Sequence, residues 1–417
     1  MVRLLAQPHN NLFIVGDDDQ SIYGFRGARP DIMQSFVKEY SPEICKLNVN
    51  YRSKGEIIAL AGRVIGHNKN RLAKKIIGTE KDFVAGSAVR VQEFQGMTEQ
   101  NEKIRDEILS YRNQKIPYRE MAVLFRTNTQ ARAISAKLKE YNIPFVMKEM
   151  VPNLYDHWIV RDILTYIRVA MGNRERANVL RIINRPKRYV HRNALTEPYI
   201  DLKELELFYE DKDWMVDRIV NLRADLGLIA DMRPYAAVNF IRRGVGYDDY
   251  IQEYAEYRGI RAADMYEILD ELQEASKGFK DFEEWFEYIR SYGEELKKQS
   301  EKSRQSDNGQ PEDAVMLMTM HGSKGLEFEC VFLPDVNEGI TPYNKAVLTE
   351  DIEEERRMFY VAMTRAKSHL HIYYLKERFS KEVSVSRFVG EMLGTPGTEA
   401  VVSSAAASSR ISFKRKR

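Results

Sequence analysis

"MLMTMHGSKGLEFECVFLPDV", residues 316–336, holds two apolar segments on either side of a polar turn. The first segment delivers Thr319 and His321 to its end, and Gly-Ser-Lys-Gly follows, a turn whose backbone amides suit a phosphate. Glu327 stands where the second apolar segment starts. Because α/β proteins place ligand-binding groups in loops that follow buried parallel strands, the stretch predicts a ligand site. A plain capping role remains an equal alternative for His321.

The sequence around this stretch repeats the same alternation. Apolar strands are expected at 88–94, 121–125, 314–320, 330–336 and 369–375, and helices at 54–67, 99–112, 127–141 and 351–366. Such alternation predicts an α/β fold, with a parallel sheet covered by helices on both faces. Between 173 and 313 the strand signals vanish and helical segments rich in tyrosine and tryptophan dominate. We therefore expect a helical insert that ends in a hydrophilic, mobile linker at 297–313.

Composition narrows the class of protein. The 417 residues are 30% charged and 43% apolar, which predicts a soluble globular chain with more than one domain. No apolar run of about 18 residues occurs, so no membrane partner is expected. Only two cysteines, Cys45 and Cys330, are present, which favours a reducing compartment such as the cytoplasm and no zinc or other metal site. With a net charge of +2, any surface for nucleic acid must be local.

"FIVGDDDQSIYGFRGA", residues 13–28, places polar side chains after a predicted short buried strand at 11–15. Gln20 could orient a water or sense a terminal phosphate, because its amide both donates and accepts hydrogen bonds. A solvated turn rich in aspartate explains the same residues equally well. Tyr23 and Phe25 suit stacking on nucleobases, although core packing is the better explanation of Phe25 taken alone.

Arg52 and Arg365 are further candidates for phosphate binding. In "LNVNYRS", residues 47–53, Tyr51 and Arg52 follow a predicted strand, where a tyrosine can stack on adenine and an arginine can bind phosphate bidentately. "EEERRMFYVAMTRAK", residues 353–367, is a predicted helix that ends at Arg365. Arg365 either complements the negative end of the helix dipole or acts as an arginine finger on a γ-phosphate.

In their order along the chain, GDDDQSIYGFRGA, NYRS, VLFRTNTQAR (residues 123–132), MTMHGSKGLEF and EEERRMFYVAMTRA resemble the motifs of the UvrD/Rep/PcrA-type superfamily 1 DNA helicases. The resemblance covers roughly residues 1–390 and implies a RecA-like motor that hydrolyses ATP with Mg²⁺ while moving 3′ to 5′ on single-stranded DNA. It implies nucleotide contacts as follows: Gln20 senses the γ-phosphate, Arg52 and Arg365 clamp it, Tyr51 stacks on adenine and Glu327 contacts the ribose. It also implies DNA contacts for Tyr23, Phe25, Arg126, Thr319 and His321, with Phe25 where many relatives have tryptophan.

The sequence departs from the family pattern at one important place. It contains no G-x-x-x-x-G-K-[ST] motif, which binds the phosphates in the family, and no Asp-Glu-x-Gln ahead of Gly16, where the family has the motif that holds the magnesium ion. We therefore expect the chain to begin partway through the first motor domain. Alone, it should neither bind ATP tightly nor work as an ATPase.

The resemblance also implies a domain plan. The expected domains are a remnant of the first motor domain (1–44), a second RecA-like domain in two parts (45–172 and 314–390), a helical insert (173–313) and a disordered basic tail (391–417). The expected partners are single-stranded DNA, junctions of single- and double-stranded DNA, and the missing N-terminal motor segment. A non-catalytic DNA-binding or regulatory protein that keeps the fold is the alternative. A helicase–nuclease subunit is disfavoured because no nuclease domain follows residue 375.

Overall fold

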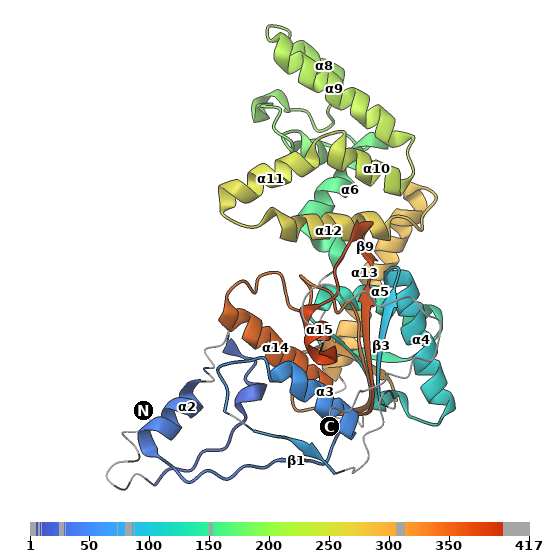
Figure 1. The fold of residues 1–417 in the computed structure, drawn as a ribbon. Coiled ribbons are helices and arrows are strands. Elements are labelled where there is room, and N and C mark those ends of the chain that lie inside the picture. Colours follow the sequence, from blue (N-terminus) through green and yellow to red (C-terminus); the bar gives the residue numbers. More distant parts are fainter. Residues whose placement is uncertain are drawn as a thin grey trace. The chain divides into compact units, whose positions relative to one another are not determined.

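The computed structural model describes residues 6, 9, 11–24, 29, 31–72, 74–79, 86, 88–149, 153–305 and 313–394, without the side chains of 295–305. The chain divides into two compact units, residues 1–151 with 310–417, and residues 152–309. Figure 1 shows a sheet with helices in the first unit and helices alone in the second. Helix α6, Trp158–Ala170, belongs to the helical unit, so the change from α/β to helical structure occurs near residue 152.

One parallel sheet organises the first unit. Its strands lie in the order β3-β8-β7-β4-β6-β5, and all neighbouring pairs are parallel. The strands are β3 Val89–Phe94, β4 Met121–Phe125, β5 Phe145–Met147, β6 Val315–Thr319, β7 Phe328–Leu333 and β8 Ala366–Leu375. Half of the sheet therefore precedes the helical unit in sequence and half follows it. This confirms the predicted α/β, RecA-like fold with a parallel sheet interrupted by a helical insert.

Strand β4 explains why the sheet is covered on both faces. Met121, Val123 and Phe125 belong to one apolar cluster, together with residues of α4 and α5. Ala122 and Leu124 belong to the other, with residues of α3, α14 and α15. The helices are α3 Gly55–Ile65, α4 Met97–Asn113, α5 Ala131–Glu140, α14 Thr349–Met363 and α15 Arg387–Leu393, in two layers that Figure 1 separates. A strand buried on both faces must be apolar throughout, which is why β4 reads as a continuous apolar run.

The helical unit builds its own core. Its helices are α6 Trp158–Ala170, α7 Arg176–Ile182, α8 Leu202–Phe208, α9 Asp213–Ala230, α10 Pro234–Arg243, α11 Tyr247–Arg258, α12 Ala262–Ala275 and α13 Phe282–Gln305. Trp285, Tyr166 and Tyr247 are fully buried in this core. Helix α13 continues to Gln305, so the first half of the predicted linker is helical, and residues 306–312 lie outside the described residues. None of the helices in the described ranges is both long and apolar enough to cross a bilayer.

The buried strand predicted at residues 11–15 is wrong. These residues are irregular, and the side chains of Phe13 and Val15 are 90% and 83% exposed. An apolar segment becomes a buried strand only beside strands that satisfy its backbone, and no described strand pairs with this one. The next helix of the first unit is α2, Asp31–Tyr40.

Short elements complete the first unit. Strands β1 (Val49–Asn50) and β2 (Ile77–Gly78) form a parallel pair, and β9 (Glu377–Arg378) pairs antiparallel with β10 (Lys381–Glu382). The predicted strand at residues 45–49 is therefore reduced to Val49 and Asn50. The predicted basic tail lies outside the described residues from 395 onward.

Candidate nucleotide and DNA sites

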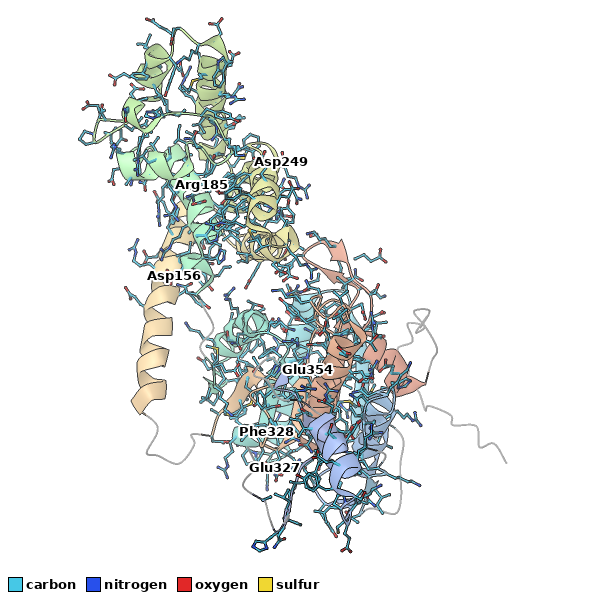
Figure 2. The ribbon with its side chains drawn as sticks, turned by 90° about the vertical axis from the view of Figure 1, so that its left-hand side faces the viewer. Asp156, Arg185, Asp249, Glu327, Phe328 and Glu354 are labelled. Carbon is cyan, nitrogen blue, oxygen red and sulfur yellow. The ribbon has the colours of Figure 1, made fainter. Side chains whose placement is uncertain are left out.

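Glu327 and Arg365 lie where strands β7 and β8 begin. Phe328 and Ala366 are paired in the sheet, and the Phe328 N–H donates to the carbonyl of Arg365 at 2.9 Å. Glu327 and Arg365 directly precede these strands, so they lie together at the amino-terminal ends of β7 and β8, which we call the amino edge. Figure 2 labels Glu327 next to Phe328, the first residue of β7.

A tight turn brings Tyr51 and Arg52 to the same edge. The Asn50 side chain accepts hydrogen bonds from the N–H groups of Arg52 (2.9 Å) and Ser53 (3.0 Å), so asparagine closes the turn. The Ser53 hydroxyl donates to the carbonyl of Ala366 at 2.6 Å, which fixes the turn to the start of β8. Tyr51 is held at the tip with 81% of its surface exposed. An aromatic face is thus presented to solvent beside a cation.

Glu327 and Arg52 pair across this edge. Arg52 Nε donates to Glu327 Oε2 at 2.6 Å, and Lys367 Nζ lies 3.4 Å from Glu327 Oε1. The hydrogen bond from Arg52 lowers the pKa of Glu327, with Lys367 adding to the effect. Asn50, Tyr51, Arg52 and Glu327 line an open hollow of about 430 Å³. The amino edge therefore offers a basic, aromatic-lined recess.

Arg365 lies behind this hollow rather than in it. Only 2% of its surface is exposed, and its guanidinium donates to the carbonyls of Val361 (2.9 Å) and Leu326 (3.0 Å). Burial lowers the pKa of Arg365 to about 10, and the neighbouring charge of Arg52 contributes. Arg365 is still charged at neutral pH, and these carbonyl partners carry no formal charge to cancel it. A rigid cation therefore stands close to Arg52.

A second group forms where strands β4 and β6 end, which we call the carboxyl edge. Phe125 pairs with Thr319, so Arg126, Thr319 and His321 emerge at the same end of the sheet. Arg126 donates to both carboxylate oxygens of Glu355 at distances from 2.6 to 3.1 Å, and its guanidinium lies 4.9 Å from the centre of the Tyr343 ring.

The other residues of the carboxyl edge are also closely surrounded. Thr319 donates its hydroxyl to Glu149 at 2.6 Å. Tyr23 approaches the carbonyl of His321 with its hydroxyl, at 3.5 Å, and the two ring centres are 6.3 Å apart. Burial lowers the pKa of His321, helped by the charge of Arg126, which favours the neutral ring. The structure thus brings Tyr23, Arg126, Thr319 and His321 together, while Phe25 lies outside the described residues.

Gln20 occupies a loop between these edges. Its side-chain amide donates to Asp17 at 2.6 Å, within its own loop. The loop rests on helix α14, because Arg357 Nε donates to the Ser21 carbonyl and the Gly24 N–H donates to Glu354, both at 2.8 Å. Lys324 Nζ, from the segment that connects β6 to β7, donates to the Gln20 carbonyl at 2.9 Å.

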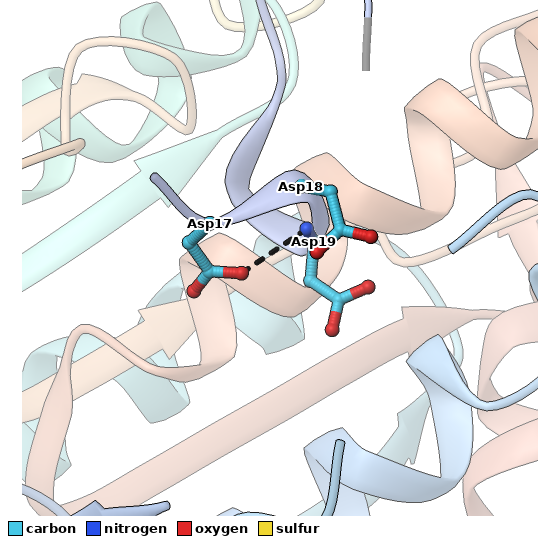
Figure 3. A group of neighbouring side chains, drawn as sticks. All are labelled: Asp17, Asp18 and Asp19. Carbon is cyan, nitrogen blue, oxygen red and sulfur yellow. Dashed lines mark hydrogen bonds between the residues drawn. The ribbon is translucent and has the colours of Figure 1, made fainter. Parts of the chain in front are cut away.

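The aspartates beside Gln20 are already paired with cations of the same chain. Figure 3 shows Asp17, Asp18 and Asp19 gathered, and their carboxylates lie close enough to share an ion. Lys74 Nζ, however, contacts all three, at 2.8 Å from Asp18 and 3.0 Å from Asp19, and Arg71 binds Asp19 through two hydrogen bonds. Burial favours a raised pKa at Asp18, but hydrogen bonds from Lys74 and the Leu72 N–H hold it below its usual value. With an ammonium in the cation position, these residues do not fit a magnesium ion.

Several hydrogen-bond and ion-pair partners in these sites were not predicted from the sequence. Glu355 and Lys367 lie within residues 353–367, a predicted helix, so helical spacing and proximity to Arg365 were available signals. Arg71 and Lys74 come from an irregular segment without periodicity, and Glu149 follows a short strand. Nothing in local sequence marks such contacts, because they join residues far apart in the chain.

A parallel sheet with charged and aromatic side chains at its strand ends is typical of ligand-binding α/β proteins. The chain belongs to the UvrD-like helicase family. The pattern of the UvrD-like helicase C-terminal domain matches residues 45–377, and that of the UvrD/REP helicase N-terminal domain matches residues 1–41. This confirms the resemblance predicted from the motifs.

Three relatives illustrate the similarity. The putative ATP-dependent DNA helicase YjcD of Bacillus subtilis is 30% identical over 94% of this chain and 52% of its own length. The ATP-dependent DNA helicase Rep of Buchnera aphidicola is 31% identical over 91% of this chain and 60% of its own length. PcrA of Staphylococcus epidermidis is 31% identical over 94% and 55%. The chain thus spans little more than half the length of these relatives.

Proposed function

We propose that this chain is the C-terminal part of an ATP-dependent 3′–5′ DNA helicase, with a nucleotide half-site at the amino edge and single-stranded DNA at the carboxyl edge. In the complete protein it would translocate on single-stranded DNA and unwind duplexes at junctions. The observation that carries this proposal is the meeting of Tyr51, Arg52 and Glu327 in one hollow, with Arg365 beside Arg52. The similarity to the ATP-dependent DNA helicases Rep and PcrA and to the putative helicase YjcD supports it.

At the amino edge, each side chain suits one part of ATP. The exposed ring of Tyr51 would stack on adenine, and Glu327 would accept hydrogen bonds from the ribose hydroxyls once Arg52 turns to phosphate. Arg52 and Arg365 would stabilise the charge that develops on the γ-phosphate, the role of an arginine finger. Gln20 would join them only after its amide leaves Asp17.

Magnesium does not fit this half-site. The described carboxylates nearest Gln20 are already paired with Lys74 and Arg71, and the sequence contains no P-loop. We propose that the P-loop and the magnesium-binding carboxylates come from a segment outside residues 1–417, and that this chain alone neither binds ATP tightly nor hydrolyses it at the rate of a motor.

At the carboxyl edge, Tyr23 would stack on a base while Arg126, Thr319 and His321 face the strand. Each stacked base contributes on the order of 1–3 kcal/mol, so a partial track should bind weakly and with strong salt dependence. Phe25 would extend this track. The helical unit would contact duplex DNA at the junction.

Reconstitution tests the proposal. An N-terminal motor segment that carries a P-loop, taken from a relative and supplied in trans or by fusion, should restore DNA-stimulated ATP hydrolysis. Duplexes with a 3′ tail should then be unwound in preference to those with a 5′ tail. Robust DNA-stimulated hydrolysis by residues 1–417 alone, or unwinding only from 5′ tails, would contradict the proposal.

A non-catalytic DNA-binding or regulatory role is the second candidate, and the absence of a P-loop motif from the sequence favours it. It predicts salt-dependent DNA binding that no motor segment converts into ATPase activity. The reconstitution therefore separates the two functions.

A further inference from the structure

Glu149 enters the carboxyl edge from strand β5. The Lys148 N–H donates to the Leu317 carbonyl at 3.0 Å, which extends the pairing of β5 with β6 by one residue. The next residue, Glu149, therefore emerges beside the end of β6. There its Oε1 accepts the hydroxyl proton of Thr319 at 2.6 Å.

The Glu149 carboxylate is pressed into the turn that follows Thr319. A Cβ atom placed on Gly322 would lie 2.5 Å from Glu149 Oε1, so the carboxylate packs closely against the backbone of this glycine. Lys148 reaches the same turn and donates from Nζ to the Gly322 carbonyl at 2.8 Å. Glu149 Oε2 is buried and has no hydrogen-bond partner within the described part of the chain. A buried carboxylate oxygen without a hydrogen-bond partner costs free energy. Movement of the Glu149 carboxylate out of this position would recover that cost.

Glu355 makes the opposite kind of contact at the same edge. It belongs to helix α14, is only 7% exposed, and accepts hydrogen bonds from Arg126 and from the Tyr343 N–H (3.0 Å). Both of its oxygens are satisfied, so it is a fixed part of the edge. Among the described residues, Glu149 accepts one hydrogen bond, from Thr319, and its other oxygen has no partner.

We infer that Glu149 is a phosphate mimic that gates the DNA track: it occupies the position of a DNA phosphate on Thr319 and must leave before a single strand can bind there. This inference rests on the proposed DNA-binding function of the carboxyl edge. A threonine hydroxyl has one proton to donate, so Thr319 serves either the carboxylate or a phosphodiester oxygen. Two anions at that place would also repel each other.

Binding of a fluorescent oligothymidylate to the full chain, followed by anisotropy at low salt, tests the gate. Glu149→Ala should bind about fivefold more tightly, the effect of removing one like charge about 4 Å from a phosphate in water. Glu140→Ala is the matched control, since it removes the same charge from the exposed end of α5, where the side chain is 57% exposed. It should change affinity less than twofold.

Thr319→Val locates the effect. In a chain that carries Thr319→Val, Glu149→Ala should raise the affinity for the oligothymidylate less than twofold. The hydroxyl for which the carboxylate and the phosphate compete is then gone. Glu149→Gln, which removes the charge and keeps the shape, serves if thermal unfolding shows that Glu149→Ala is not folded. Equal binding by Glu149→Ala, Glu140→Ala and the unchanged chain would overturn the gate alone. Absence of binding in every protein would overturn the DNA-binding function and the gate with it.

Discussion

The amino edge and the carboxyl edge belong to one sheet but hold their arginines differently. At the amino edge, Arg365 is fixed by carbonyls and Arg52 pairs with the half-exposed Glu327. At the carboxyl edge, Arg126 is bound through both carboxylate oxygens to the buried Glu355. Arg365 has uncharged partners, whereas Arg52 and Arg126 each pair with a carboxylate, which is half-exposed at the amino edge and buried at the carboxyl edge. In the proposed function, a ligand of the carboxyl edge would therefore compete with a buried anion, and a phosphate at the amino edge would not.

The largest expected effect is on turnover at the amino edge. In the reconstituted protein, Arg365→Ala should lower DNA-stimulated ATP turnover by about 10³-fold, as removal of an arginine finger does. Affinity for single-stranded DNA should stay within about twofold. Arg387→Ala, which removes an exposed arginine paired with Glu338, is the control and should change neither quantity. A parallel loss of DNA affinity in Arg365→Ala would erase the distinction between the edges.

At the carboxyl edge the expected effect is on stability. Arg126→Ala leaves the buried Glu355 without its charged partner, and losing one member of a buried pair costs about 3 kcal/mol. Urea unfolding should show this loss. The double variant Arg126→Ala/Glu355→Gln should recover part of it, because no buried charge is then left unpaired. If high salt removed the stability difference between Arg126→Ala and the unchanged chain, the pair would behave as an exposed ion pair.

His371 lies within strand β8, between the two edges, and supplies a pH response of the sheet itself. Its ring nitrogens contact the hydroxyls of Tyr111 (2.8 Å) and Tyr373 (2.9 Å), and burial lowers its pKa to about 3. The unfolded histidine takes up a proton below pH of about 6.5 and the folded one does not, so the free energy of unfolding should fall as the pH falls from 6.5 toward 3.

Between pH 7 and pH 5 this loss should be about 2 kcal/mol. Urea unfolding at the two pH values should show a smaller loss in His371→Gln, whereas His67→Gln, at a half-exposed position, should behave like the unchanged chain. Equal pH dependence of unfolding in all three proteins would show that His371 does not cause the loss of stability.

The smallest expected effect concerns the exposed pair of the amino edge. Glu327→Gln should lower the free energy of unfolding by less than about 1 kcal/mol, because exposed ion pairs are weak. Since Arg52 lowers the pKa of Glu327, the contribution is present above pH of about 4.5 and is lost as the pH falls below it. Moderate salt should abolish it. A loss as large as that of Arg126→Ala would show that this edge is not open to solvent.

Two apolar segments show what can and what cannot be predicted from the sequence. Residues 121–125 and residues 11–15 carry the same kind of apolar run. The first is a fully buried strand between β6 and β7, and the second is exposed and irregular. Periodicity predicts that a segment can be a strand, but burial needs neighbouring strands.

The order of strands and helices, the interruption by a helical insert and the motifs of the family were determined by the sequence itself. They depend on local periodicity and on residue types at fixed spacing, which a linear chain displays directly. The sequence also placed Thr319 and His321 at the carboxyl end of a predicted strand, where α/β proteins expose ligand-binding groups, Glu327 at the start of the next strand and Arg365 at the end of a helix.

Only the tertiary structure decided which partner each of these groups has. Lys74 contacts three aspartates more than fifty residues away, Glu355 pairs with Arg126, and Glu149 accepts a hydrogen bond from Thr319. Burial of Arg365 likewise depends on the packing of α14 against the sheet. Such pairings arise when strands distant in the chain become neighbours in the sheet, and electrostatic interaction depends on distance in space rather than along the chain.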